Sequence, residues 1–119
     1  MTFTLPLLII TIVLALVSSL SGIAKVSGNA RALAAPRAVG SPDGLSRLAG
    51  MLELLAGISM VLGLVFDFLD LIVWGLVTIW IVMLGALFFH FRSGKIKSGF
   101  PAFVILTLAT IALTLAMAG

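Results

Sequence analysis

Long apolar runs dominate the chain and are separated by short stretches that carry its charges. Four of these runs are long enough to cross a bilayer, since a membrane-spanning helix needs about 20 mostly apolar residues. The first run has no basic residue before it, unlike a cleaved signal peptide, so we expect it to stay in the protein. The pattern therefore predicts one membrane domain, residues 1–119, with four transmembrane helices at about 3–24, 48–66, 71–91 and 100–118.

The overall composition agrees with this pattern. Hydrophobic residues make up 62% of the chain and charged residues 9%. A soluble domain is about 45–50% apolar and about 25% charged, and a disordered chain has low hydrophobicity and high charge. Both classes are excluded, and the first partner that the composition implies is the lipid bilayer.

The few charges are unevenly distributed along the chain. All seven Lys and Arg residues lie in or beside the first and third connections, whereas the second connection holds Asp67 and Asp70 and no base. By the positive-inside rule, the basic connections face the cytoplasm and both termini lie outside. We expect this basic face to lie close to anionic lipid headgroups, which explains the net charge of +3. We therefore predict no nucleic-acid partner.

The first connection, about residues 26–46, is the only long one. Its segment 29–35 favours a short helix that stops at Pro36, because proline disfavours helical geometry in the residue before it. Residues 41–44 (SPDG) are typical of a turn leading into the second span. We therefore predict an all-α fold: a four-transmembrane-helix bundle with a longer first cytoplasmic loop that contains a short interfacial helix.

Missing residue types exclude several kinds of chemistry. The chain has no Cys, which excludes disulfides, thiolate nucleophiles and Cys-ligated metal sites. It has one His, so one protomer cannot supply two imidazoles to a haem. We predict no metal site.

Ionisable side chains within the spans are the main indication of a functional site, because such groups are costly in a membrane. Glu53 lies six residues beyond Arg47, about 9 Å along the helix axis. His90 stands two residues before Arg92, and Lys25 ends the first span. All four belong to the cytoplasmic half, so the sequence predicts a polar cluster of Lys25, Arg47, Glu53 and His90.

The helical spacing predicts that each span turns one small or polar stripe toward the bundle interior. The glycines at 75 and 85 should offer further close contacts. The predicted stripes are Thr11, Ser18, Ser21, Gly22 and Lys25; Gly50, Glu53 and Gly57; Ile79, Met83, Ala86 and His90; and Thr107, Thr110 and Thr114. The sequence leaves open whether Glu53 belongs to a structural ion pair or to a functional polar site.

Three segments together resemble the small DoxX-like membrane proteins: Gly22-x-x-Lys25, the block from Arg47 to Gly57 (RLAGMLELLAG), and Met83-Leu84-Gly85-Ala86 with His90. The resemblance covers nearly the whole chain, with Ala56 standing where a Gly is common. The family takes its name from a membrane subunit of a thiosulfate:quinone oxidoreductase. The resemblance thus implies a prokaryotic inner-membrane protein. The residues that match the polar positions of the family are Lys25, Arg47, Glu53 and His90, and the resemblance assigns none of them an established catalytic role.

Three functions follow as hypotheses, and the sequence does not establish whether the protein is an enzyme. The first is an accessory subunit of a membrane complex, one linked to quinone redox chemistry, with other membrane subunits or further copies of the chain as partners. The second is a stand-alone protein that binds or transforms a lipid-soluble molecule or a quinone at the Glu/His/Arg site. The third is a small proton-coupled transporter.

Overall fold

The computed structural model describes residues 4–118 and confirms an all-helical fold with four helices long and apolar enough to span a membrane. A short helix in the first connection and a single 3-10 turn in the third complete the described part of the chain. In chain order the elements are α1 (Leu5–Val26), α2 (Ala30–Ala38), α3 (Asp43–Val65), α4 (Leu69–Arg92), η1 (Ile96–Gly99) and α5 (Phe100–Ala118).

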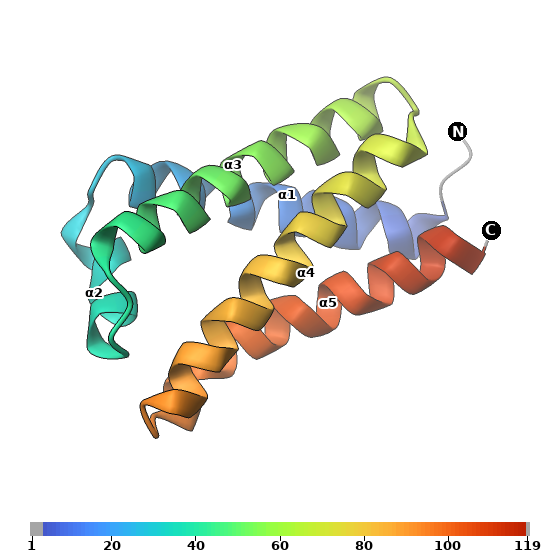
Figure 1. Ribbon diagram of the computed structural model, residues 1–119. Coiled ribbons are helices and arrows are strands. Elements are labelled where there is room, and N and C mark those ends of the chain that lie inside the picture. Colours follow the sequence, from blue (N-terminus) through green and yellow to red (C-terminus); the bar gives the residue numbers. More distant parts are fainter. Residues whose placement is uncertain (1–3, 119) are drawn as a thin grey trace.

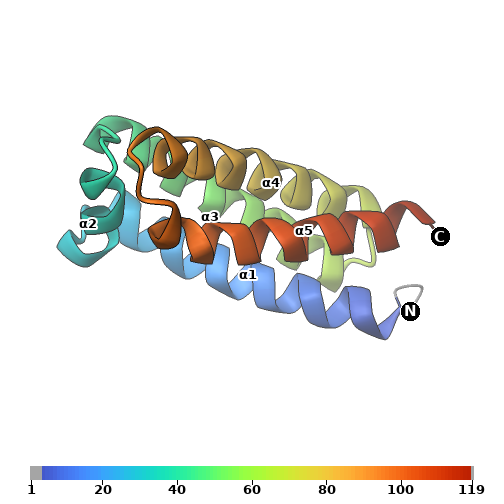
Figure 2. The same cartoon turned by 90° about the horizontal axis from the view of Figure 1, so that it is seen from below.

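The four long helices form an up-and-down bundle (Figure 1). Helix α1 packs against α3, α3 against α4, α4 against α5, and α5 returns to α1. Figure 2 shows the N- and C-terminal ends of the described chain at one end of the bundle and α2 at the other. The long helices that follow one another in the chain are thus antiparallel neighbours, whether the connection is short or contains α2.

The end of the bundle that holds α2 and η1 also holds all the basic side chains, and we call it the basic end. It contains the C-terminal ends of α1 and α4 and the N-terminal ends of α3 and α5 (Figures 1 and 2). The seven bases there are Lys25, Arg31, Arg37, Arg47, Arg92, Lys95 and Lys97. The charge separation predicted along the sequence is therefore a separation between the two ends of the folded molecule.

Helices α1 and α3 approach each other very closely because glycines stand at their contact. A Cβ atom on Gly22 would lie 2.5 Å from the carbonyl oxygen of Gly50 and 2.6 Å from the backbone nitrogen of Leu54. A Cβ atom on Gly50 would lie 2.5 Å from Cβ of Lys25. The predicted inward stripes of α1 and α3 are confirmed, and their backbone contact sets Lys25 opposite α3.

Helices α3 and α4 are held close near the 66–68 turn and separate toward the basic end (Figure 1). Near the turn, a Cβ atom on Gly63 would lie 2.6 Å from Cγ1 of Ile72, and one on Gly75 would lie 2.6 Å from Cγ of Met60. Gly85, farther along α4, is exposed and has no atom within 4 Å of its ideal Cβ position, so the predicted contact at Gly85 is wrong. The two helices thus diverge where the bundle receives α2.

The predicted inward threonine stripe of α5 is also wrong. Thr107, Thr110 and Thr114 are exposed, and each hydroxyl donates to the carbonyl four residues earlier, at 2.8–2.9 Å. A threonine hydroxyl that donates to its own helix does not require a partner in the bundle interior, although Thr110 also accepts from Trp80 Nε1 of α4 at 3.0 Å. The residues that α5 buries are alanines, whose small size permits close packing: Ala102, Ala109, Ala112 and Ala116.

Helix α2 extends farther than predicted. The side chain of Asn29 caps it by accepting hydrogen bonds from the backbone N–H groups of Arg31 and Ala32, at 2.9 and 3.2 Å. Pro36 lies inside the helix and does not end it, because a proline in the last turn removes a single helical hydrogen bond. The carbonyl of Pro36 then accepts from Val39 and Ser41 as the chain leaves the helix.

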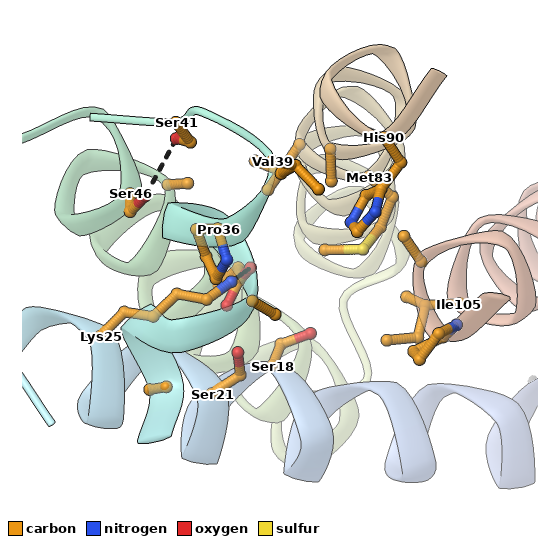
Figure 3. A pocket seen from close by; sticks show the side chains of 18 of the residues that line it. Ser18, Ser21, Lys25, Pro36, Val39, Ser41, Ser46, Met83, His90 and Ile105 are labelled. Atoms are coloured by element: carbon orange, nitrogen blue, oxygen red, sulfur yellow. Dashed lines mark hydrogen bonds and ion pairs between the residues drawn. The ribbon is translucent and has the colours of Figure 1, made fainter. Parts of the chain in front are cut away.

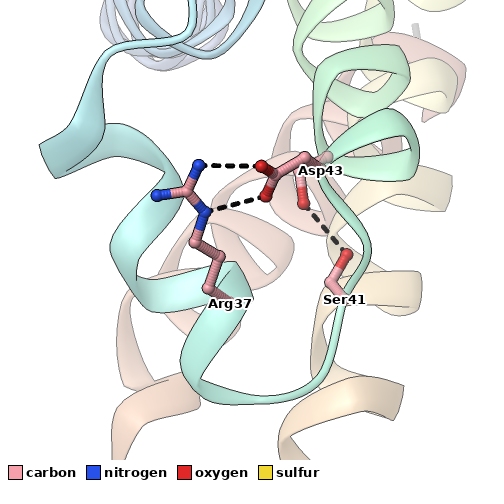
Figure 4. A network of polar contacts seen from close by, with 4 residues as sticks. Arg37, Ser41 and Asp43 are labelled. Carbon is pink, nitrogen blue, oxygen red and sulfur yellow. Dashed lines mark hydrogen bonds and ion pairs between the residues drawn. The ribbon is translucent and has the colours of Figure 1, made fainter.

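Helix α3 also begins earlier than the predicted span, at Asp43, with Pro42 as its N-cap. Figure 4 shows the Arg37 guanidinium meeting the Asp43 carboxylate through two hydrogen bonds, of 2.8 and 2.7 Å. These bonds raise the pKa of Arg37 above its ordinary value. Beside them the hydroxyls of Ser41 and Ser46 are 3.0 Å apart. The residues predicted as a turn therefore include the first turn of α3, which is fastened to α2.

Candidate functional site

A cavity of about 270 Å³ opens at the basic end, where α3 and α4 diverge. All four long helices line it, together with α2 and the 96–99 turn. Its walls are mainly apolar or small, as at Val39, Met83 and Ile105 (Figure 3). Lys25, Glu53 and His90 supply its ionisable groups, and five serines supply hydroxyls: Ser18, Ser21, Ser41, Ser46 and Ser98. The divergence of α3 and α4 leaves this space, and α2, which packs against α3 and α1, forms one of its walls.

Lys25 and Glu53 form an ion pair at one side of the cavity. The Lys25 Nζ atom donates to Glu53 Oε1 at 2.9 Å. Glu53 is 1% exposed, and the Lys25 side chain is 19% exposed. Figure 3 shows Lys25 extending from α1 into the cavity. The glycine contact between the two helices places these residues opposite each other, 28 positions apart in sequence.

His90 faces the same cavity from α4 (Figure 3). It is 8% exposed, and its Nδ1 atom lies 2.6 Å from the hydroxyl oxygen of Ser98. Ser98 in turn donates to the carbonyl oxygen of Lys95 at 2.7 Å. Sequence reasoning missed Ser98, because a serine in a short polar loop gives no periodic signal. The chain from Lys95 through Ser98 holds the His90 ring in place.

A second missed contact joins the two basic connections. The Lys95 ammonium donates to the carbonyl oxygen of Ala38, the last residue of α2, at 2.8 Å. Helix C-termini carry unpaired carbonyls and a partial negative charge, so a lysine is favoured there. This bond ties α2, which covers the cavity, to the segment that orients His90.

Arg47 does not join the other predicted cluster residues. It is exposed and absent from the cavity lining, and its guanidinium packs where a side chain at Gly28 would stand. Six residues on an α-helix turn the side chain by about 600°, so Arg47 and Glu53 point about 120° apart. Of the four predicted residues, the structure brings Lys25, Glu53 and His90 to one cavity and leaves Arg47 outside it.

His90 also borders a second hollow, of about 390 Å³, on the α4–α5 side of the bundle. This hollow is largely apolar, with Phe91, Phe100 and Phe103 among its lining and Lys97 as its charged residue. His90 therefore lies between the cavity that holds the Lys25–Glu53 pair and a largely apolar hollow. Among residues 4–118 no group of three or more His, Asp or Glu side chains could hold a metal ion.

The model of the DoxX-like family matches residues 9–117. The chain belongs to the DoxX-like family. Comparison with curated proteins and with solved structures gives no match. The match confirms the resemblance found in the sequence, and it covers α3 and α4, nearly all of α1 and α5, and every cavity residue of this DoxX-like protein.

Proposed function

We propose that this DoxX-like membrane protein binds a small, lipid-soluble molecule whose polar head lies in the cavity at the basic end. The observation that carries the proposal is that one cavity contains both the buried Lys25–Glu53 pair and the buried His90 ring. Ionisable groups inside a membrane bundle mark functional sites by default, because an apolar side chain would be cheaper there.

The size and lining of the cavity support a small ligand. Small-molecule pockets measure about 300–1,000 Å³ and are mostly apolar, with a few polar groups that orient the ligand. At about 270 Å³ the cavity lies just below that range, so it suits a head group and the first part of a tail. A quinone is the cofactor that such a site would take if the protein serves redox chemistry, with Glu53 and His90 as proton-handling groups.

Filling the cavity tests this function. Ala86 lines the cavity, and Leu84 is exposed on the same helix two residues earlier. We expect native mass spectrometry of the wild-type protein, released from its own membrane in mild detergent, to show one tightly bound small molecule per chain. Ala86→Phe should lose that molecule, because the ring occupies its place, whereas the control Leu84→Phe should retain it.

Two results would contradict the proposal. Wild-type protein that carries no bound molecule would show that the cavity is not a ligand site in its own membrane. Retention of the same molecule by a folded Ala86→Phe variant would place the ligand elsewhere on the protein. Circular dichroism and a monodisperse elution profile establish that each variant is folded.

A role as an accessory subunit of a membrane complex is the second candidate, because the DoxX-like family takes its name from a membrane subunit of such a complex. The two functions are compatible, because a subunit can hold the ligand cavity of its complex. Purification in mild detergent should then recover partner subunits in fixed stoichiometry. A homo-oligomer without other subunits would speak against the accessory role while leaving the ligand site intact.

We further propose that the basic end faces the cytoplasm, and the absence of cysteine from the chain makes this simple to test. Ala34 in α2 and Phe66 in the opposite turn are both exposed, so a single cysteine that replaces either of them should be accessible to a reagent. A membrane-impermeant maleimide should label Phe66→Cys in intact cells and Ala34→Cys only after lysis. The reverse labelling pattern would contradict this orientation.

A further inference from the structure

One oxygen of the buried carboxylate has no hydrogen-bond partner. Lys25 donates to Glu53 Oε1, but Oε2 is buried and accepts no bond from any group of residues 4–118. Leaving a buried acceptor without a donor is unfavourable, and more so for a charged group. Glu53 lines the cavity, and Oε2 itself has less than 1 Å² of accessible surface, so a donor held in that space reaches it when the carboxylate turns toward the cavity.

The hydrogen bonds of His90 show that a second acceptor borders the same cavity. Ser98 has one hydroxyl proton and gives it to the carbonyl oxygen of Lys95. Ser98 must therefore accept at the 2.6 Å contact, so that His90 Nδ1 carries the proton. In the neutral imidazole Nε2 is then the acceptor, and the hydrogen-bond network assigns this tautomer.

We infer that the molecule in this cavity carries a hydroxyl group on its polar head, as an alcohol or a phenol does. This inference rests on the proposed function and adds the ligand's chemical class. A hydroxyl can donate its proton to Glu53 Oε2. Its oxygen can also accept from the Lys25 ammonium, which has N–H groups besides the one that donates to Glu53 Oε1. A head group with only carbonyl or ether oxygens leaves Oε2 unpaired.

A matched pair of probes tests this specificity: a para-alkylphenol and its methyl ether, both with the same alkyl chain. Their saturable binding is measured on the full-length protein in lipid nanodiscs, with empty nanodiscs subtracting partition into lipid. We expect the phenol to bind about tenfold more tightly or better, the ratio that one hydrogen bond to a charged group supplies.

Two variants assign the preference to the carboxylate. Glu53→Gln keeps the shape and an oxygen for Lys25 but puts an N–H donor in the place of Oε2, so the preference should vanish or turn toward the ether. Thr107→Val, on the exposed side of α5 and outside the cavity, should retain the wild-type preference. A Glu53→Gln variant that is folded and still favours the phenol would overturn the inference.

The outcomes separate this inference from the proposed function. Equal, saturable binding of both probes by the wild-type protein would leave a ligand cavity in place and show that water, not a ligand hydroxyl, satisfies Oε2. If neither probe bound saturably, the hydroxyl preference would be overturned. Native mass spectrometry of the protein released from its own membrane would still test separately whether the cavity is a ligand site.

Discussion

Replacing Lys25 with methionine is expected to lower the free energy of unfolding by about 3–5 kcal/mol, because it leaves the buried Glu53 carboxylate without its counter-charge. Glu53 is 1% exposed and its second oxygen already has no partner, so no described group replaces the ammonium. Methionine retains the length and the apolar contacts of the lysine stem. Unfolding in mixed micelles at increasing denaturant measures the loss.

A second substitution identifies the cause of that loss. The double variant Lys25→Met/Glu53→Gln removes both charges and should recover most of the stability, whereas Glu53→Gln alone should be mild because the amide oxygen still accepts from Lys25. Arg37→Ala removes the exposed pair with Asp43 and should change the stability little. A Lys25→Met variant as stable as wild type would show that the pair does not hold the bundle together.

Gly22→Val is expected to separate α1 from α3 and to destabilise the bundle by about 3 kcal/mol, at the upper end for an overpacked core. The added atoms would collide with the backbone at Gly50 and Leu54, which cannot move aside as a flexible side chain can. Separation of the helices would also draw Lys25 away from Glu53. The same micelle unfolding experiment measures the stability, and probe binding measures the cavity.

Gly85→Ala is the matched control on another long helix. The ideal Cβ of Gly85 meets no atom within 4 Å, and alanine is favoured over glycine in a helix by about 1 kcal/mol. This variant should be as stable as wild type or slightly more stable. If Gly22→Val were equally well tolerated, the close α1–α3 contact would not exist.

The sequence predicts the helices and most of their inward faces because both follow from local regularities. Apolar length identifies the four spans, and the spacing of Gly22, Gly50 and Gly57 indicates where backbones meet. The same spacing rule fails for Thr107, Thr110 and Thr114 on α5, because each hydroxyl donates its proton to a carbonyl of its own helix. Polar periodicity alone cannot distinguish a buried hydroxyl from one satisfied within its own helix.

The candidate site is only partly predictable for a related reason. Counting residues places Lys25, Glu53 and His90 at one depth, and the structure adds that they border one cavity. The depth of a residue in the membrane does not determine the direction of its side chain around the helix axis, so Arg47 lies on another side of α3 from Glu53. The contacts of Ser98 and Lys95 depend on how the two basic connections fold over the bundle, and no pattern within either connection encodes that.

An experimental structure of the protein, extracted from its own membrane with its lipids retained, would show directly whether the cavity holds a ligand. We expect continuous non-protein density in the cavity between α1, α3, α4 and α5, with a ligand oxygen within hydrogen-bond distance of Glu53 Oε2. A cavity closed by its own side chains, or one filled by separate water molecules alone, would contradict it.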